Sequence, residues 1–403
     1  MKTRPAAAFL AILLAAPLWA QDKKDDATPD PLLQAKIDDA IRRGVAWLKT
    51  AESIVPWAEF GGNSDELILW TFVHADVSTK DPAFQTLLQR MLAAKLDRTY
   101  KVALQAMILE EIDRVAYQAR IWQCAQFLVD NQCANGQWSY GEETPAVANM
   151  PTPAKVVDVA TAPVSGVRDF STPAAGKKTK PKVVRKIPVQ KTKTGPASGD
   201  NSNSQYAALG LRACSEAGIK LPKESLGLAR KWWLDCQHGG DKEKKVATGK
   251  ITADPRGWCY DVKDGHPAYG SMTAGAIGSV AILDYLLDLD WKKDPSVASG
   301  LAWLTAHYTV TENFGPPQER AAGTAEFYYY YLYALERAGI LAGTEVLGTH
   351  KWYLEGAKVL VEAQQPDGSW THGGEWNKPS WNTCFAILFL KRATRPLVAS
   401  VDR

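Results

Sequence analysis

Acidic, aromatic and histidine side chains that could do chemistry gather before one apolar segment, which begins near Ser271. They are Asp254, Trp258, Tyr260, Asp261, Asp264 and His266. Aromatic rings beside a few carboxylates suit the stacking of sugar rings or the enclosure of an apolar ligand. Two carboxylates at the right separation could also supply the acid and the base of glycoside hydrolysis.

Comparable residues precede other apolar segments. Glu326 comes directly before the aromatic run Phe327 to Tyr331. We take Asp254, Asp261 and Glu326 as candidate acids. The candidate ligand contacts are Asn203, Trp258, Tyr260, Asp264, His266, Tyr329, Trp376, Trp381 and Asn382. The alternative interpretation is that these carboxylates cap helices and these tyrosines pack in the core.

Histidine and cysteine spacing bears on metals and disulfides. The six His occur singly, without a pair at the helical spacing of metal ligands, so we expect neither a metal site nor a bound cofactor. Cys236 and Cys259 flank an interrupted repeat and are the pair that we single out as a candidate disulfide. The six Cys otherwise have the character of small core residues.

One phrase occurs repeatedly in the chain. Gln132 to Trp138 and Gln364 to Trp370 share the frame Gln, three residues, Gly, one residue, Trp, and a third, interrupted copy runs from 237 to 258. The Gly permits a positive φ or a close backbone approach after a helix, and the Trp buries its indole while its N–H finds an acceptor. The phrase therefore predicts an outer helix, a turn and an inner helix rich in Ala and Leu.

Apolar periods and capping residues predict six helix pairs. The expected ranges are 34–50 with 63–76, 82–94 with 98–111, 115–132 with 202–217, 225–237 with 270–288, 296–308 with 322–338, and 350–364 with 379–393. No strand pattern appears, so we expect an all-α protein. With 46% hydrophobic residues over 403 positions, the chain can bury a large core.

The N-terminal segment of the chain suggests export. Two basic residues precede an apolar run over 9–16, and the small residue Ala20 follows. Such a run is typical of a cleavable signal and is too short for an ordinary membrane span. We expect a signal peptide over 1–20, a disordered linker over 21–33 and a C-terminal tail over 394–403. The mature protein should be periplasmic or secreted and should lack a transmembrane span.

Residues 141–200 are rich in Pro, Ala, Thr and Lys and lack a sustained apolar period. The part from 151 to 195 holds ten Lys or Arg and two Asp, although the whole chain has a net charge of only +3. We expect a disordered basic insertion on an acidic body. The alternative is contact with an anionic partner, such as a lipid headgroup or an acidic polysaccharide. Phe170 is the only aromatic residue in 145–200, so we expect no nucleic-acid partner.

The repeated phrase and the alternation of outer and inner helices resemble the prenyltransferase and squalene-cyclase repeat family. The resemblance covers about residues 34–393 apart from the insertion. Segments 200–206, 270–273 and 331–339 are similar to uncharacterised exported bacterial members. The resemblance implies a single α/α-toroid domain, in which six outer helices surround six inner helices and a central cavity opens at the inner-helix N-termini.

The catalytic motifs of that superfamily do not match this sequence. Cyclases protonate their substrate with Asp-x-Asp-Asp, whereas 288–290 reads Asp-Leu-Asp and continues with Trp. The magnesium-binding Asp-Asp-x-x-Asp of terpene synthases fails at 38–42, which reads Asp-Asp-Ala-Ile-Arg. The prenyltransferase zinc ligands are not matched at 270–273 or 382–384, and the Gly-Cys-Gly-Glu-Gln motif of thioester domains is missing.

Three functions remain open. The first is a non-catalytic exported toroid that binds an apolar or glycan ligand, or a protein partner, at its cavity rim. The second is an isoprenoid enzyme that uses Asp65, Asp254, Asp261 or Glu326 as an atypical acid, recognisable by a deep aromatic cavity and one buried carboxylate of raised pKa. The third is a polysaccharide lyase or glycoside hydrolase with facing acids in an open groove. We favour the first because the catalytic motifs are missing.

Overall fold

The computed structural model describes residues 28–50, 64–143, 180–238, 245–248, 251–261, 267–315, 327–372 and 378–398. Its helices are α1 (Pro31–Leu48), α2 (Ser64–His74), α3 (Pro82–Ala93), α4 (Thr99–Asp113), α5 (Gln118–Asp130), α7 (Asn201–Glu216), α8 (Lys223–Asp235), α9 (Gly270–Leu286), α10 (Pro295–Ala306), α12 (Tyr328–Ala342), α13 (Trp352–Ala363) and α14 (Pro379–Leu390), with a short 3-10 turn over Trp291–Lys293. The prediction of an all-α protein is confirmed. Each predicted segment corresponds to one helix, with ends that differ by a few residues.

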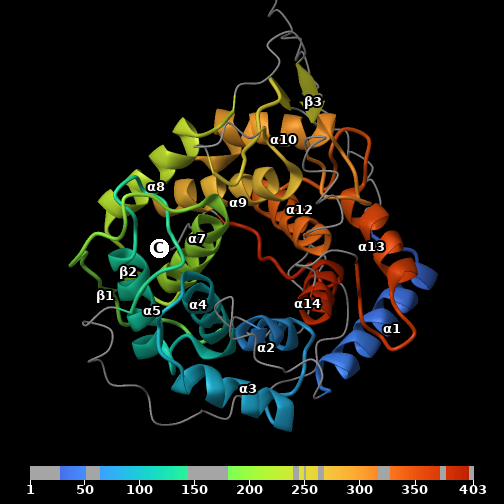
Figure 1. Cartoon of the computed structure of the whole chain (residues 1–403), viewed down its shortest axis with the longest axis horizontal. Coiled ribbons are helices and arrows are strands. Elements are labelled where there is room, and N and C mark those ends of the chain that lie inside the picture. Colours follow the sequence, from blue (N-terminus) through green and yellow to red (C-terminus); the bar gives the residue numbers. More distant parts are fainter. Residues whose placement is uncertain are drawn as a thin grey trace, which may run out of the picture.

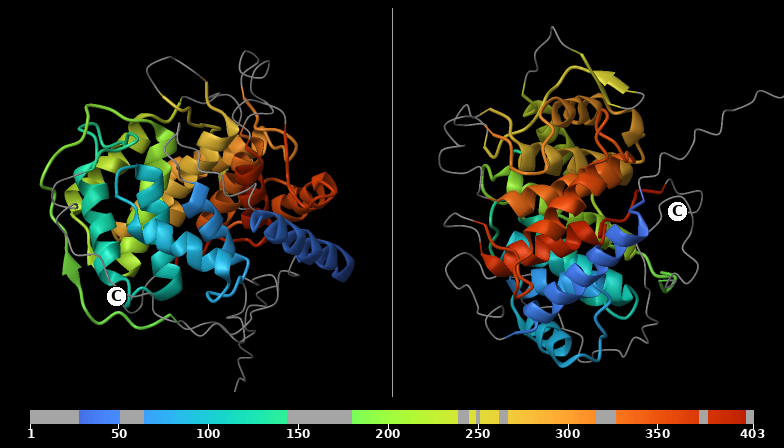
Figure 2. Two further views of the ribbon diagram at one scale, coloured as in Figure 1. Left: turned by 60° about the horizontal axis from the view of Figure 1, so that its bottom comes forward. Right: turned by 90° about the vertical axis from the view of Figure 1, so that its right-hand side faces the viewer.

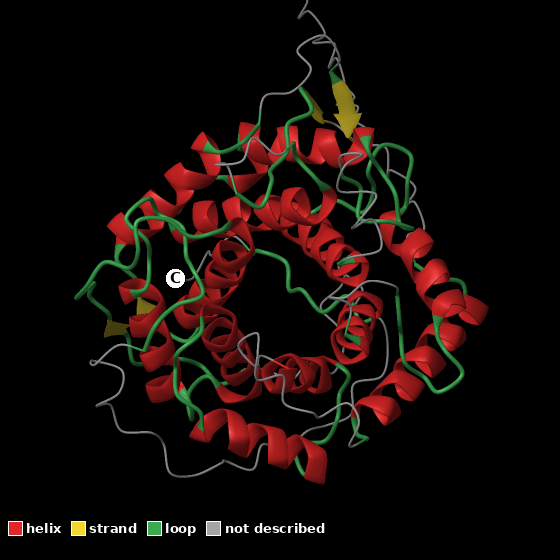
Figure 3. Cartoon of the chain, viewed as in Figure 1, coloured by secondary structure: helices red, strands yellow, loops and turns green. Residues whose placement is uncertain are grey.

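Helices α2, α4, α7, α9, α12 and α14, which we call the inner helices, form a closed series of contacts. Each packs against the next one named, and α14 packs against α2 (Figure 1). The outer helices α1, α3, α5, α8, α10 and α13 lie outside this series (Figure 3). Each outer helix contacts at least one inner helix, so the core lies between the two sets.

The sequence of each set explains its layer. Every residue of α9 except Tyr285 is buried, which a helix needs when it has neighbours on all sides. A Cβ on Gly275 would lie 2.3 Å from Gln205 Oε1, and one on Gly278 would lie 2.9 Å from Leu341 Cδ1. Small residues therefore let α9 approach α7 and α12, as the composition predicts. Outer helix α1 instead buries one stripe, formed by Leu33, Ile37, Ala40, Ile41, Gly44 and Leu48.

The three copies of the repeated phrase make the same contacts. Each Trp is fully buried, its indole N–H donates to a carbonyl of the preceding outer helix, and its backbone N–H donates to a hydroxyl of the following inner helix. The indole N–H groups of Trp138, Trp258 and Trp370 donate to the carbonyls of Leu128, Trp233 and Leu360, respectively. The backbone N–H groups of the same three residues donate to the hydroxyls of Ser204, Thr273 and Thr383. The phrase is thus a clamp between an outer and an inner helix.

The Gln of each phrase ties one outer helix to the next. Its Nε2 donates to a backbone carbonyl of the following outer helix in all three copies. The contacts are Gln132 with Ser225 O at 2.8 Å, Gln237 with Ser296 O at 3.0 Å, and Gln364 with Ala40 O at 2.8 Å. The last contact joins α13 to α1, so helices from the two ends of the chain meet.

Short strands, which the sequence pattern does not predict, occur in two places. β1 (Ile187–Pro188) pairs in parallel with β2 (Ile219–Lys220), and β3 (Val246–Thr248) pairs antiparallel to β4 (Ile251–Ala253). The β3–β4 pair packs on α10 and projects beyond it (Figure 2). Strands of two or three residues are too short to give an alternating pattern, which is why the sequence shows no strand signal there.

Part of the basic insertion docks on α5, where the sequence predicts disorder. Asp130 Oδ1 accepts the Thr192 N–H at 2.6 Å, and Trp122 Nε1 donates to Pro188 O at 2.9 Å. The expectation of a disordered segment over 141–200 therefore does not hold for 180–200. These contacts use backbone groups of the insertion and polar side chains of α5, which leave no apolar period in the sequence.

The segment after α14 runs across the inner helices toward α4 and α7 (Figure 1). Arg212 of α7 donates to Arg395 O at 2.9 Å and to Pro396 O at 3.1 Å, and Thr394 Oγ1 donates to Glu336 Oε2 at 2.6 Å. The start of the predicted tail is therefore bonded to inner helices. No helix in the described ranges is long and apolar enough to cross a membrane.

Candidate ligand-binding site

Hydroxyl groups from three inner helices meet near the helix N-termini. Tyr100 of α4 hydrogen-bonds Ser202 Oγ of α7, and both oxygens lie 3.3 Å from Tyr330 Oη of α12. Gln205 Nε2 also donates to Tyr330 Oη, at 2.6 Å. Because α12 is not next to α4 or α7 in the inner series, these bonds span its interior. Burial raises the pKa of Tyr100 and of Tyr330, so both stay protonated.

A buried arginine lies behind these hydroxyls. Arg337 is 2% exposed, and its guanidinium carbon lies 4.3 Å from the ring centroid of Tyr333 and 5.6 Å from that of Tyr206. Its Nη2 donates to Gln205 Oε1 at 2.8 Å. Aromatic faces attract a guanidinium most strongly when water is excluded, and here they replace a carboxylate partner. The four tyrosines of the run 328–331 are also buried, as are Tyr333 and Tyr206.

Three exposed aromatic residues stand at the starts of the same inner helices. Tyr140, Tyr260 and Phe327 are 56%, 38% and 44% exposed, and no other aromatic residue of the described ranges is an exposed large hydrophobic. Tyr140 O accepts the Thr99 N–H that begins α4, at 2.7 Å, and Tyr260 O accepts the Asn201 N–H that begins α7, at 3.0 Å. We call Tyr140, Tyr260 and Phe327 the aromatic rim.

Phe327 occupies an unusual backbone conformation. Its φ of 58° puts it in the left-handed region at the N-cap of α12. A bulky residue there is uncommon, and such strain persists only where the surroundings fix it. The Phe327 ring lies 6.4 Å from the Tyr330 ring in an edge-to-face arrangement. This contact connects the aromatic rim to the hydroxyls of Tyr100, Ser202 and Tyr330, which we call the hydroxyl cluster.

Asp200 adds a carboxylate to this end of the helices. Its Oδ1 accepts the Asn203 backbone N–H at 2.7 Å, and its Oδ2 accepts Asn203 Nδ2 at 2.8 Å. Burial raises the pKa of Asp200, although the hydrogen bonds from Asn203 and Tyr260 oppose that rise. Asn203 Oδ1 is buried and has no hydrogen-bond partner within the described ranges, so a hydroxyl donor would satisfy it.

Two buried carboxylates with a strongly raised pKa face elsewhere. Burial raises the pKa of Glu66 and of Glu336 to about 7. Glu66 Oε1 accepts Gln105 Nε2 at 3.2 Å, and Gln105 in turn accepts Arg120 of outer helix α5, so Glu66 faces the space between the layers. Glu336 holds Thr394 instead. Neither carboxylate is among the candidate acids named from the sequence, which are Asp65, Asp254, Asp261 and Glu326.

The residues predicted as site residues separate into different environments. Tyr260 lies in the aromatic rim and Asn203 beside it, whereas Trp258 is a fully buried clamp residue rather than a ligand contact. Tyr329 is buried, and its hydroxyl donates to Thr371 O at 3.4 Å. Asn382 is 4% exposed near the start of α14. The structure thus brings Tyr260 and Asn203 to the same helix start, and of these five residues only Tyr260 is exposed.

The remaining predicted residues are half-buried or not described. Asp254 and Asp261 lie on the segment 251–261, and Asp254 Oδ1 is buried without a hydrogen-bond partner in the described part of the chain. Trp381 packs partly buried against the core. Asp264, His266, Glu326 and Trp376 lie outside the described residues.

Sequence reasoning missed Tyr140 and the meeting of Tyr100 with Ser202, and it noted the run from Phe327 to Tyr331 without taking Phe327 or Tyr330 as ligand contacts. Tyr140 follows the first Gln-Gly-Trp phrase by two residues, as Tyr260 follows the third, so the repeat itself carried a signal. Tyr100 and Ser202 have no such mark. Their meeting depends on the approach of helices that are far apart in sequence.

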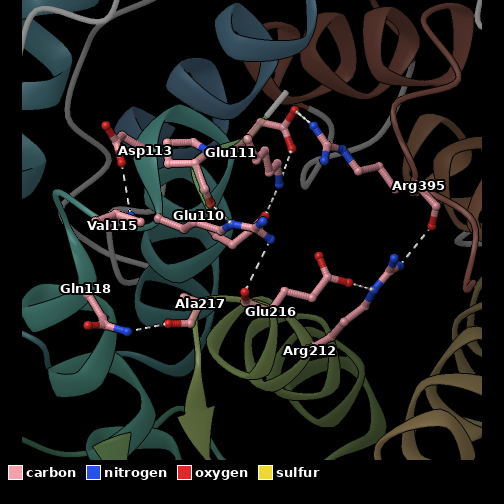
Figure 4. Close-up of polar contacts among 12 residues, drawn as sticks. Glu110, Glu111, Asp113, Val115, Gln118, Arg212, Glu216, Ala217 and Arg395 are labelled. Atoms are coloured by element: carbon pink, nitrogen blue, oxygen red, sulfur yellow. Dashed lines mark hydrogen bonds and ion pairs between the residues drawn. The ribbon is translucent and has the colours of Figure 1, made fainter. Parts of the chain in front are cut away.

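An ion-pair cluster lies at the C-terminal ends of α4 and α7, whereas the hydroxyl cluster lies at their N-terminal ends (Figure 4). Arg395 pairs with Glu111, Lys180 of the insertion bridges Glu110 and Glu111, and Arg212 pairs with Glu216 at 2.8 Å. The pocket beside this cluster has a volume of ≈ 50 Å³ and is bounded by inner-helix side chains and the C-terminal segment. A few waters fill such a volume, whereas ligand pockets usually hold at least about 300 Å³.

Within the described ranges, no group of three or more His, Cys, Asp and Glu residues has the arrangement of a metal site. The six Cys are free and buried, and this includes the candidate disulfide pair Cys236 and Cys259. Cys259 Sγ lies 2.9 Å from His238 Nε2. In comparisons with known proteins, no family model and no curated protein matches the chain.

Proposed function

We propose that the protein is an exported α/α toroid that binds a carbohydrate at the aromatic rim, without catalysing a reaction. The toroid is supported by the closed series of inner-helix contacts and by the outer-helix link from α13 to α1. The resemblance to the prenyltransferase and squalene-cyclase repeat family points the same way. Export is supported by the apolar N-terminal run alone.

The observation that carries the proposal is the position of Tyr140, Tyr260 and Phe327. Exposed aromatic faces at the starts of three inner helices offer stacking surfaces for sugar rings. Hydroxyls of Ser202 and Tyr330, the Asp200 carboxylate and Asn203 Oδ1 lie at the same helix starts. Asn203 Oδ1 is the one polar atom of this set without a hydrogen-bond partner in the described ranges, so a ligand that carries a hydroxyl group matches it better than a wholly apolar ligand does.

Calorimetric titration of the mature protein with soluble oligosaccharides tests the proposal. Tyr260→Ala and Phe327→Ala should each weaken binding by up to roughly tenfold, because one aromatic contact contributes about 0.5–1.5 kcal/mol beyond its buried area. Val184→Ala and Leu289→Ala are matched controls, since both residues are exposed and hydrophobic but lie away from the rim. Failure of all neutral and acidic oligosaccharides to bind, or equal loss in the controls, would reject a carbohydrate site here.

Export needs a separate test. The proposal expects periplasmic or extracellular fractionation and a mature N-terminus near residue 21, read by mass spectrometry. A cytoplasmic protein that begins at Met1 would refute export and leave the binding proposal unaffected.

A further inference from the structure

A surface pocket of ≈ 340 Å³ lies between the end of α7, the start of α8 and the docked part of the insertion. Lys186, Lys220 and Lys223 line it, with Leu226 and Leu286 among its apolar residues. No acidic residue is among its lining residues. The pocket is far larger than the ≈ 50 Å³ space beside Arg395 and reaches the size range of small-molecule sites.

The β1–β2 pairing builds the pocket. Ile187 N–H donates to Gly218 O at 3.0 Å and Val189 N–H donates to Lys220 O at 3.1 Å, so Lys186 is held next to β2. Gln118 Nε2 of α5 fixes the same approach, because it donates to both Arg185 O and Ala217 O at 2.8 Å.

Gly218 allows the two strands to come this close. It has φ 84°, and a Cβ there would lie 2.8 Å from Arg185 O. One of the three lysines therefore belongs to the insertion, and the other two belong to the helical body.

No acidic side chain lines the pocket, although Glu224 follows Lys223 in the first turn of α8. The three lysines form no ion pair with another residue of the described ranges. The N-terminus of α8 adds its own positive end, since Pro222 at the N-cap supplies no side-chain acceptor for the first-turn amides. An anion bound among these three lysines would be attracted by each of them. The apolar floor indicates that the ligand also has an apolar part.

We propose that this pocket binds a phosphate monoester that carries a short apolar group. A phosphate has close to two negative charges at neutral pH and accepts hydrogen bonds from several ammonium groups at once. Helix N-termini stabilise the same group. The ester could be a free metabolite or a lipid headgroup with the same chemistry. This proposal is independent of carbohydrate binding at the rim.

Titration of the full chain with hexyl phosphate tests the proposal, with hexanol and inorganic phosphate as probes that each lack one half. A variant with Lys186→Gln, Lys220→Gln and Lys223→Gln removes the three charges. The matched control carries Lys36→Gln, Lys80→Gln and Lys358→Gln, which removes the same charge at exposed positions outside the pocket. We expect hexyl phosphate to bind more tightly than either partial probe, with at least a tenfold loss of affinity in the pocket variant and less than a twofold change in the control.

Sedimentation with vesicles distinguishes the two sources. Phosphatidylcholine vesicles that contain phosphatidic acid should retain the wild-type chain and release the pocket variant if the ligand is a headgroup. Binding of hexyl phosphate without vesicle binding assigns the site to a free ester. The proposal is overturned if hexyl phosphate and the vesicles both fail to bind, or if the pocket and control variants lose binding equally.

Discussion

Gly368→Ala tests whether the last repeat turn holds α13 against α1. Gly368 has φ 95°, and a Cβ there would lie 2.7 Å from Arg43 O of α1. The same turn holds Gln364, whose Nε2 donates to Ala40 O at 2.8 Å. An added methyl group therefore strains the turn and pushes it away from α1.

Variants at two other glycines separate the contribution of backbone strain from that of the steric clash. Gly343 has φ 74° and nothing within 4 Å of an added Cβ, so Gly343→Ala should cost only the left-handed strain, about 1–2 kcal/mol. Gly227 lies within α8 with open space around it, so Gly227→Ala should stabilise the protein by about 0.5–1 kcal/mol. Gly368→Ala adds a backbone clash of about 1–3 kcal/mol to the strain, for a total of about 2–5 kcal/mol.

Urea unfolding followed by tryptophan fluorescence measures all three variants against the wild type. The order of midpoints should be Gly227→Ala, wild type, Gly343→Ala and Gly368→Ala, from highest to lowest, with similar slopes. If Gly368→Ala is no less stable than Gly343→Ala, the close contact between this turn and α1 is refuted. The hydrogen bond from Gln364 to Ala40 would then be the remaining support for the link between α13 and α1.

The remaining predictions concern buried ionisable groups. The pKa of Glu66 rises from 4.5 to about 7 on folding, so the folded state binds a proton more tightly than the unfolded state, and the free energy of unfolding should fall by about 3 kcal/mol as pH rises from about 4.5 to 7. Glu66→Gln should remove that loss, which urea titrations at pH 5 and 8 would measure. An unchanged pH dependence in this variant would contradict the prediction. Burial raises the pKa of the Cys236 thiol to about 12. Iodoacetamide at pH 8 should therefore leave Cys236 unmodified in the native protein and alkylate it in urea, as measured by mass spectrometry. Labelling of the native protein would show that the thiol is accessible. Thr394→Val removes a 2.6 Å donor from the buried Glu336 carboxyl and should cost about 1–3 kcal/mol in urea unfolding, whereas no loss would mean that the C-terminal segment is not held there.

The sequence predicts the helices well because each carries its own local signal. Apolar periods placed most helices within a few residues, although α4, α5, α8, α9, α12, α13 and α14 have no side-chain cap. The Gln-Gly-Trp phrase agrees with the positive φ at Gly136 and Gly368 and with the bonded indoles. The site is harder to predict because its contacts join distant segments. Tyr100 and Tyr330 are 230 residues apart. Docking of 180–200 likewise depends on hydrogen bonds from backbone N–H groups to Asp130, and such bonds leave no periodic pattern in the sequence.

Filling of the space between the inner helices links the fold to the proposed function. Tyr330, Tyr333 and Arg337 all extend from α12, and they contact α4, α7 and α2 through the hydroxyl cluster, Gln205 and Trp70. A toroid enzyme that encloses a long substrate needs that space open, and removal of these side chains would leave a buried guanidinium or hydroxyl partner unpaired. These contacts place hydrogen-bonded side chains between the inner helices, whereas the rings of Tyr140, Tyr260 and Phe327 are exposed at the helix starts, where we propose that a carbohydrate binds.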